Sequence, residues 1–68
     1  MGSKSMVEFA AVFVRATDLA ILVEIDGEEV WLPLSELGDD SDLGEDSERG
    51  DEGSVFVPEW LATAKGLV

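Results

Sequence analysis

The dipeptide Asp26-Gly27 constrains the fold of this chain more than any other feature, because it separates two runs of β-type residues. A two-residue type I′ turn needs positive φ at both central positions, and Asp-Gly is one of the pairs that adopt it readily. The run before it, residues 19–25, alternates with a period of two, and residues 28–32 are placed to pair back against it. Pro33 has no amide proton and ends this strand or marks a sheet edge. We therefore predict a β-hairpin over residues 19–32.

The segments on either side of this hairpin complete a small α+β fold. A first strand is predicted from Val7 to Val14, with a turn over residues 16–18. Residues 34–37 suit either a helical turn or a continuation of the strand. A last strand over residues 54–57 leads to Pro58, which favours the first position of a helix of about eight residues. The helix face expected to pack on the sheet carries Trp60, Leu61, Ala64 and Leu67, with Gly66 as the residue after its end.

The predicted architecture is therefore a small antiparallel β-sheet or open barrel, with strands ordered β-β-β-loop-β along the chain and one short C-terminal helix. Residues 1–5 precede a second methionine and have the composition of an expression-tag remnant. Residues 6–68 are then a single small domain, near the lower size limit for a chain that folds without disulfides or metals.

The net charge excludes several classes of function. The chain has 16 acidic and 4 basic residues, with a formal net charge of −12. Such a chain repels phosphate backbones and anionic lipids, so neither direct nucleic-acid binding nor membrane binding is expected. Its hydrophobic fraction of 46% is too high for a disordered acidic tail. We expect a folded domain with a very negative surface.

Over half of that net charge lies in one segment, residues 38–53, which has the composition of a loop. Its only apolar residue is Leu43, and a loop of this length in so small a domain is either mobile or functional. Three interpretations remain open: a calcium site, a solvated flexible loop, or a spread of carboxylates that occupies a basic surface on another protein. The spacing does not match an EF-hand loop. The oxygen ligands on offer are Asp39, Asp40, Asp42, Glu45, Asp46 and Glu48.

The residue types present argue against an enzyme. The chain has no cysteine and no histidine, which removes disulfides, thiol nucleophiles and imidazole acid–base chemistry. Glu28 and Glu29 are adjacent on a predicted strand, so they point to opposite faces and cannot act together on one substrate. We predict no catalytic residues, no metal and no cofactor.

Two residues of the third strand are candidates for partner binding. Alternation places Trp31 on the same face as Glu29, opposite Val30 and Leu32. The indole is expected to be covered by the C-terminal helix, and the alternative is that it stays exposed and anchors a partner. Both faces of the first two strands are largely apolar, which one short helix cannot cover. A homodimer or a docked host protein would cover the remaining face.

Two stretches of the chain carry a resemblance to a known family. They are ILVEIDGEEVWLP at residues 21–33, followed by Ser35, and VPEWLA at residues 57–62, followed by KGL at residues 65–67. These stretches resemble a family of small accessory proteins carried by bacteriophages and prophages. Members often have a basic residue at the position of Leu34, which this chain lacks. The resemblance implies a phage accessory protein in the cytoplasm of a bacterial host, and it implies no catalytic residues.

The predicted function is protein–protein binding, with inhibition of a host nucleic-acid-binding defence complex, such as a CRISPR effector or nuclease, as its sharper form. The protein would act as a nucleic-acid mimic on a host or phage protein with a basic surface. The residues expected to contact it are Asp39, Asp40, Asp42, Glu45, Asp46, Glu29 and Trp31. Reversing the five loop charges is expected to abolish binding and leave the fold intact. The alternative is a structural or assembly module of the phage that dimerises through its sheet, with a loop that only adds solubility.

Overall fold

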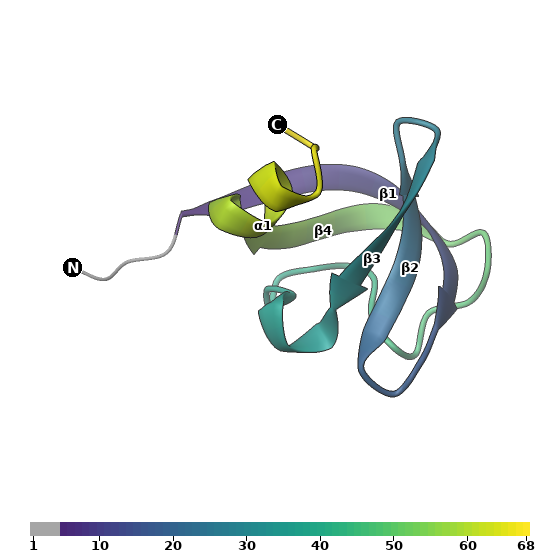
Figure 1. The fold of residues 1–68 in the computed structure, drawn as a ribbon. Coiled ribbons are helices and arrows are strands. Elements are labelled where there is room, and N and C mark those ends of the chain that lie inside the picture. The colour runs from purple at the N-terminus through teal and green to yellow at the C-terminus, as the bar shows by residue number, and fades with distance from the viewer. Residues whose placement is uncertain (1–4) are drawn as a thin grey trace.

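The computed structural model describes residues 5–68, so the predicted tag remnant lies outside the described residues except for Ser5. The chain forms a four-stranded antiparallel sheet with one short C-terminal helix, which confirms the predicted α+β class (Figure 1). In chain order the elements are β1 (Met6–Ala16), β2 (Ala20–Ile25), β3 (Glu28–Pro33), the 3₁₀ helix η1 (Leu34–Glu36), β4 (Glu52–Pro58) and α1 (Glu59–Ala64).

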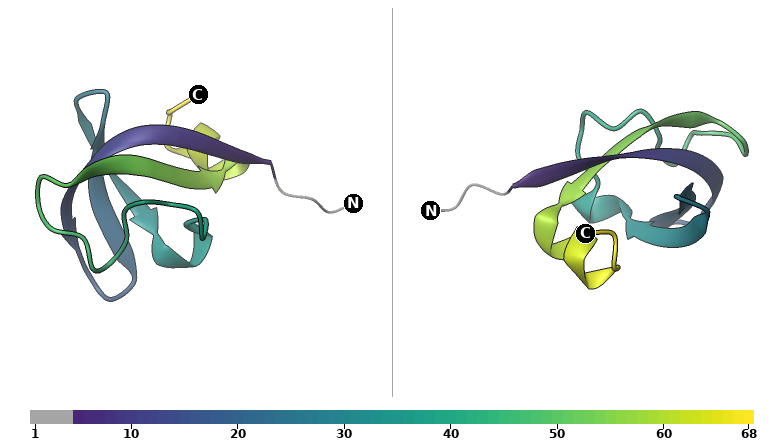
Figure 2. Two further views of the ribbon diagram at one scale, coloured as in Figure 1. Left: turned by 180° about the vertical axis from the view of Figure 1, so that it is seen from behind. Right: turned by 90° about the horizontal axis from the view of Figure 1, so that it is seen from above.

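The sheet has the strand order β3-β2-β1-β4, and β1 is its long central strand. The first half of β1 pairs with β4, from Met6 opposite Pro58 to Val12 opposite Glu52. Its second half pairs with β2, and the register shifts between Phe13 and Arg15. A bulge of this kind bends a strand and increases its twist. The sheet therefore curls around one face, as the two views in Figure 2 show.

The turn between β2 and β3 has the predicted backbone conformation. Asp26 has a φ of 54° and Gly27 a φ of 84°, so both central residues lie in the left-handed region that a type I′ turn requires. The turn fixes the register of the hairpin, in which Ile25 pairs with Glu28 and Glu24 with Glu29. The strand starting at residue 19 was predicted one residue too long, because Leu19 precedes β2 and is exposed.

The inner face of the curled sheet holds the hydrophobic core. The residues that alternate on that face of each strand are buried, as the period-two pattern predicts. They are joined by Leu43 from the acidic loop and by two residues of α1. The buried core comprises Ala11, Phe13, Ile21, Val23, Ile25, Val30, Leu32, Leu43, Val55, Val57, Leu61 and Ala62.

The C-terminal helix is shorter than predicted and presents a different face. It runs from Glu59 to Ala64 after Pro58, and Gly66, with a φ of 76°, follows its end as predicted. Leu67 N–H donates to the Ala62 carbonyl oxygen at 2.8 Å, which closes a Schellman motif. Leu61 and Ala62 are buried, whereas Trp60 is 57% exposed. The prediction that Trp60 and Ala64 pack on the sheet is therefore wrong, because six residues make fewer than two turns and only one narrow face of the helix meets the sheet.

Other strand boundaries also differ from the predictions, since β1 spans Met6–Ala16 and not Val7–Val14, and β3 ends at Pro33 and not at Leu32. Strand β4 begins at Glu52, two residues before the predicted start, because the ladder with β1 extends to Val12. The segment after Pro33 is a single 3₁₀ turn, η1, which was one of the two alternatives. Among residues 5–68, no helix combines the length and the apolar character needed to cross a membrane.

Candidate functional site

The first part of the acidic loop lies along the outer edge of β4 and satisfies its hydrogen bonds. Gly38 N–H donates to the Phe56 carbonyl oxygen and Asp42 N–H to the Ser54 carbonyl oxygen, each at 2.7 Å. In return, Phe56 N–H donates to Ser41 Oγ and Ser54 N–H to Asp42 Oδ2, each at 2.9 Å. Side-chain oxygens thus stand where a neighbouring strand would present carbonyl groups. Residues 38–42 act as an irregular cover for an edge that would otherwise be open (Figure 2).

The rest of the loop is anchored at two further points. Leu43 is 4% exposed and belongs to the core, so the one apolar residue of the loop fixes its middle. At the far end, Gly50 N–H donates to the Phe13 carbonyl oxygen at 2.9 Å, and Phe13 N–H donates to the Asp51 carbonyl oxygen at 2.8 Å. Between these points, Glu48 N–H donates to Asp51 Oδ2 at 2.9 Å. The loop is therefore a chain of hydrogen-bonded turns and not the structureless segment that its composition suggests.

Asp42 differs in role from the other predicted loop residues. Both its main-chain N–H and its side-chain Oδ2 bond to Ser54, so this carboxylate is a structural acceptor on the edge of β4. Asp39, Asp40, Glu45 and Asp46 are exposed. A charge reversal that includes Asp42 would remove an anchor of the loop together with a surface charge. A charge test that is meant to leave the fold unchanged is therefore better restricted to the other four positions.

The four remaining loop carboxylates do not converge on one point. Residues 39–40 lie beside Met6 and Phe56, at the end of the sheet where β1 begins. Glu45 lies beside residues 16–18, in the turn that follows the other end of β1. The acidic loop thus spreads its charge along the length of the domain. Within residues 5–68, no group of three or more His, Cys, Asp or Glu side chains is placed to hold a metal ion.

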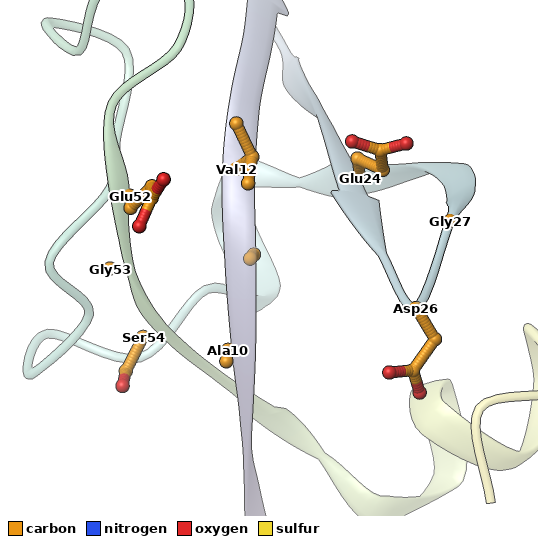
Figure 3. A pocket seen from close by; sticks show the side chains of 9 residues that line it. Ala10, Val12, Glu24, Asp26, Gly27, Glu52, Gly53 and Ser54 are labelled. Atoms are coloured by element: carbon orange, nitrogen blue, oxygen red, sulfur yellow. The ribbon is translucent and has the colours of Figure 1, made fainter.

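A row of three carboxylates crosses the outer face of the sheet. Val12 of β1 is paired with Glu24 of β2 on one side and with Glu52 of β4 on the other. Glu24 is paired in turn with Glu29 of β3. Directly paired residues share a face, so this row runs from one edge strand to the other with only Val12 between its carboxylates. Figure 3 shows Glu24, Val12 and Glu52 of this row.

The row borders a shallow hollow whose floor is made of small residues. Ala10 and Val12 of β1 lie between Glu24 and Asp26 on one side and Glu52 and Gly53 of β4 on the other (Figure 3). Long cationic side chains can rest their methylene groups on apolar surface and keep the charge beside carboxylates. The hollow therefore suits lysine or arginine side chains of a partner, and it is too open to enclose a small substrate.

Trp31 lies on the outer face of the sheet and is paired with a cation. Leu22 is opposite both Arg15 and Trp31 in the ladder, and Arg15 Cζ lies 5.6 Å from the centre of the indole ring. The two side chains leave Leu22 only 7% exposed, whereas Trp31 remains 36% exposed. The prediction that the helix covers Trp31 is wrong, because α1 packs on the inner face. The alternative, an indole that is open to a partner, agrees with its position.

Replacing Glu24 with glutamine is expected to stabilise the domain. Like charges directly opposite each other on a sheet are destabilising, and relieving one such pair contributes about 0.5 kcal/mol. Glu24 faces Glu29 across the hairpin. Urea titration should therefore give a higher free energy of unfolding for Glu24→Gln than for wild type. Glu8→Gln is the matched control, because Glu8 faces Phe56. An equal gain in both variants would assign the effect to the net charge alone.

Gly53→Ala is expected to destabilise the domain by about 2 kcal/mol, a usual cost of an overpacked site. A Cβ atom at Gly53 would lie 2.6 Å from the Cβ atom of Asp42, so the loop must shift and weaken its bonds to Ser54. Gly44→Ala is the control, since its Cβ would meet nothing within 4 Å. Thermal unfolding of the two variants checks this prediction, and equal melting temperatures would contradict it.

Sequence reasoning missed Glu24 and Glu52 as members of the acidic surface. The signal for Glu24 was available, because a two-residue turn at Asp26-Gly27 necessarily pairs residue 24 with residue 29. No comparable signal existed for Glu52, whose place depends on the long-range pairing of β4 with β1. The predicted site residues Glu29 and Trp31 lie on the strand at the opposite edge of the sheet from the loop.

In comparisons with known proteins, no family model, no curated protein and no solved structure matches this chain.

Proposed function

We propose that this protein binds another protein and occupies its basic nucleic-acid-binding surface. The observation that carries the proposal is the anchored acidic loop, in which Asp39, Asp40, Glu45 and Asp46 are exposed and the backbone is hydrogen-bonded to the sheet on either side of them, at residues 38, 42, 50 and 51. Charges on a preorganised backbone bind with a smaller loss of conformational entropy than charges on a free chain. A rigid, extended spread of carboxylates is also what a groove built for a phosphate backbone would recognise.

The outer face of the sheet extends this negative surface. Glu24, Glu29 and Glu52 lie in one row across the strands, so carboxylates reach from the loop at one edge to β3 at the other. With a net charge of −12, the molecule would be attracted to a positive surface from a distance at low ionic strength. The open hollow and the absence of histidine and cysteine from the chain support a binding role over a catalytic one.

We further propose a class of target, on the basis of the resemblance of residues 21–33 and 57–67 to bacteriophage and prophage accessory proteins. A phage protein of this kind would act in the cytoplasm of a bacterial host, on a defence complex that binds nucleic acid. CRISPR effectors and defence nucleases bind nucleic acid in basic grooves, and an acidic surface would complement such a groove in charge. We infer that binding alone, without chemistry, would inhibit such a complex.

The proposal is tested by displacement from immobilised DNA. Bacterial lysate is bound to DNA-cellulose at low salt, and the column is eluted with the pure protein. We expect selective elution of one or a few DNA-binding proteins, and loss of this elution as salt rises. Polyglutamate at the same concentration of carboxylates is the control for bulk charge. Equal elution profiles for polyglutamate and the protein would contradict a specific binding surface.

The second candidate is an assembly module that self-associates through the outer face of its sheet. The observation that favours it is the half-buried state of Val12 and Phe56 on a face without a covering layer. Repulsion between two copies of net charge −12 opposes it. Sedimentation of the pure protein at a salt concentration that screens this repulsion distinguishes the two, since the assembly module would form a dimer and the inhibitor would remain a monomer.

A further inference from the structure

The two edges of the sheet differ in how their main-chain groups are satisfied. At the β4 edge, the outward N–H and carbonyl groups of Ser54 and Phe56 all bond to the acidic loop. At the β3 edge, the sheet ends without a neighbouring strand. An edge strand with unpaired N–H and carbonyl groups is a template for another strand. The question is which groups β3 presents there.

The hydrogen-bond pattern of the hairpin identifies these groups. Leu34 N–H donates to the Leu19 carbonyl oxygen at 2.8 Å, one step beyond β3, which fixes the alternation of bonded pairs along the ladder. The bonded residues of β3 are therefore the even-numbered ones, 28, 30 and 32, and the main-chain groups of Glu29 and Trp31 point away from β2. Among residues 5–68, no hydrogen bond joins these groups to another segment.

We propose that the open edge of β3 binds an extended, positively charged segment of the partner protein by β-strand addition. The edge presents two donors and two acceptors, from Glu29 and Trp31, and Pro33 limits it by having no N–H. The added strand is therefore short, roughly 3–5 residues. This inference rests on the proposed function, because the positive charge of the partner is part of that proposal.

Charge complementarity selects the occupant. Glu28 and Glu29 lie on the edge strand itself, and Glu24 lies directly behind Glu29 on the outer face. A basic side chain opposite Glu29 would gain a favourable cross-strand pair and relieve the repulsion between Glu24 and Glu29. The exposed ring of Trp31, next along this face, would add apolar contact area. An acidic or neutral strand gains neither effect.

A second copy of the chain fits this edge less well. It would bring a further net charge of −12 and the same pair of edge glutamates. Charged residues and proline at an edge strand are the usual features that prevent identical edges from pairing. Glu28, Glu29 and Pro33 therefore exclude a copy of the chain, while the glutamates attract a cationic strand.

The test uses two synthetic peptides and amide hydrogen exchange measured by NMR. The probe is an eight-residue peptide of alternating lysine and valine. Its control is the same peptide with N-methyl groups on alternate residues. N-methylation keeps the charge of the peptide and removes the backbone N–H groups that would bond to β3. We expect the probe to slow exchange at the Glu29 and Trp31 amides by about tenfold and the control to have no effect. Equal binding of both peptides would overturn strand addition. Slow exchange of the Glu29 and Trp31 amides in a homodimer of the protein, with no peptide present, would also overturn it.

Variants of Glu29 separate hydrogen bonding from charge. Glu29→Pro removes an outward N–H donor at an edge position where proline is tolerated. The affinity of the variant for the probe peptide is expected to be about tenfold lower than that of wild type. Glu29→Gln keeps the N–H donor, and its affinity for the probe peptide is expected to fall less. Where Glu29→Pro fails to fold by circular dichroism, the two peptides on the wild-type protein still decide the question.

The same variant distinguishes this inference from the proposed function. If Glu29→Pro displaces DNA-bound proteins as well as wild type does, strand addition is overturned and the proposed function stands. If Glu29→Pro loses displacement and Glu29→Gln retains most of it, both stand. If wild type itself displaces nothing beyond the effect of polyglutamate, the proposed function fails, and the inference that rests on it fails with it.

Discussion

Replacing Leu43 with alanine is expected to lower the free energy of unfolding by about 3 kcal/mol, within the usual range for a buried leucine. Leu43 is 4% exposed and is the only residue of the acidic loop in the core. Its loss leaves a cavity against the inner face of the sheet and frees the middle of the loop. For a domain of this size, with a total stability of roughly 3–9 kcal/mol, the change removes a large part of the whole.

Leu19→Ala is the matched control for this substitution. Leu19 is the same residue type but is 80% exposed in the turn before β2, so its truncation is expected to change stability by less than about 0.5 kcal/mol. Urea titration of the two variants and wild type measures the difference. Equal midpoints for Leu43→Ala and Leu19→Ala would show that the loop is not anchored in the core and would contradict the structural basis of the binding surface.

Replacing residues 39–50 with a glycine–serine linker is expected to cause association through the β4 edge. The replacement removes Ser41 and Asp42, whose side chains accept hydrogen bonds from Phe56 and Ser54. The edge of β4 would then present unpaired main-chain groups, and the chain would also lose six carboxylates and Arg49, which carry −5 of its net charge of −12. Sedimentation velocity is expected to show species larger than wild type that grow with protein concentration.

A very short turn cannot serve in this experiment. Gly38 lies beside Phe56, whereas Asp51 lies beside Phe13 at the other end of β4. Five residues of β4 separate these points, a span of roughly 17 Å at the usual rise of a strand. The linker should therefore have about eight residues. A variant that keeps Ser41, Asp42 and Leu43 and replaces only residues 44–49 is the control, and it is expected to sediment as wild type does. If the 39–50 and 44–49 replacements both form larger species, association results from the lost charge and not from the uncovered edge of β4.

Much of the fold could be predicted from the sequence because its signals are local. The Asp26-Gly27 turn set the hairpin and its register, and period-two alternation identified the inner-face residues of β1 and β2. Gly66 predicted where the helix ends, because a glycine with positive φ commonly follows the last turn. Each of these features depends on residues close together in the chain, whose conformational preferences the tertiary structure did not override.

The state of the acidic loop could not be predicted because its anchors are long-range. Composition indicates a polar, charged segment, and it contains no information that Ser41 and Asp42 would meet β4. The bulge near Phe13, which bends β1, has no signature in a run of valine and phenylalanine. For the same reason Asp42 was grouped with the exposed carboxylates, although it is a structural acceptor.

The candidate site was predicted in part. The exposed loop carboxylates and Glu29 are where a surface role requires them, and Trp31 is open on the outer face. The partner of Trp31 was missed, because Arg15 reaches it across Leu22 from two strands away. Glu52 was missed because its place in the acidic row depends on the pairing of β4 with β1.

The central claim is that carboxylates fixed on the loop bind a basic protein surface, and four positions test it most directly. The variant Asp39→Asn, Asp40→Asn, Glu45→Gln, Asp46→Asn removes the exposed charges and keeps the anchors, whereas Asp39→Glu, Asp40→Glu, Glu45→Asp, Asp46→Glu keeps the charge at the same positions. The measurement is the protein concentration needed to displace half of a bound protein from DNA-cellulose. We predict an increase of about tenfold or more for the amide variant and little change for the charged one. Equal concentrations for wild type and both variants would contradict the claim.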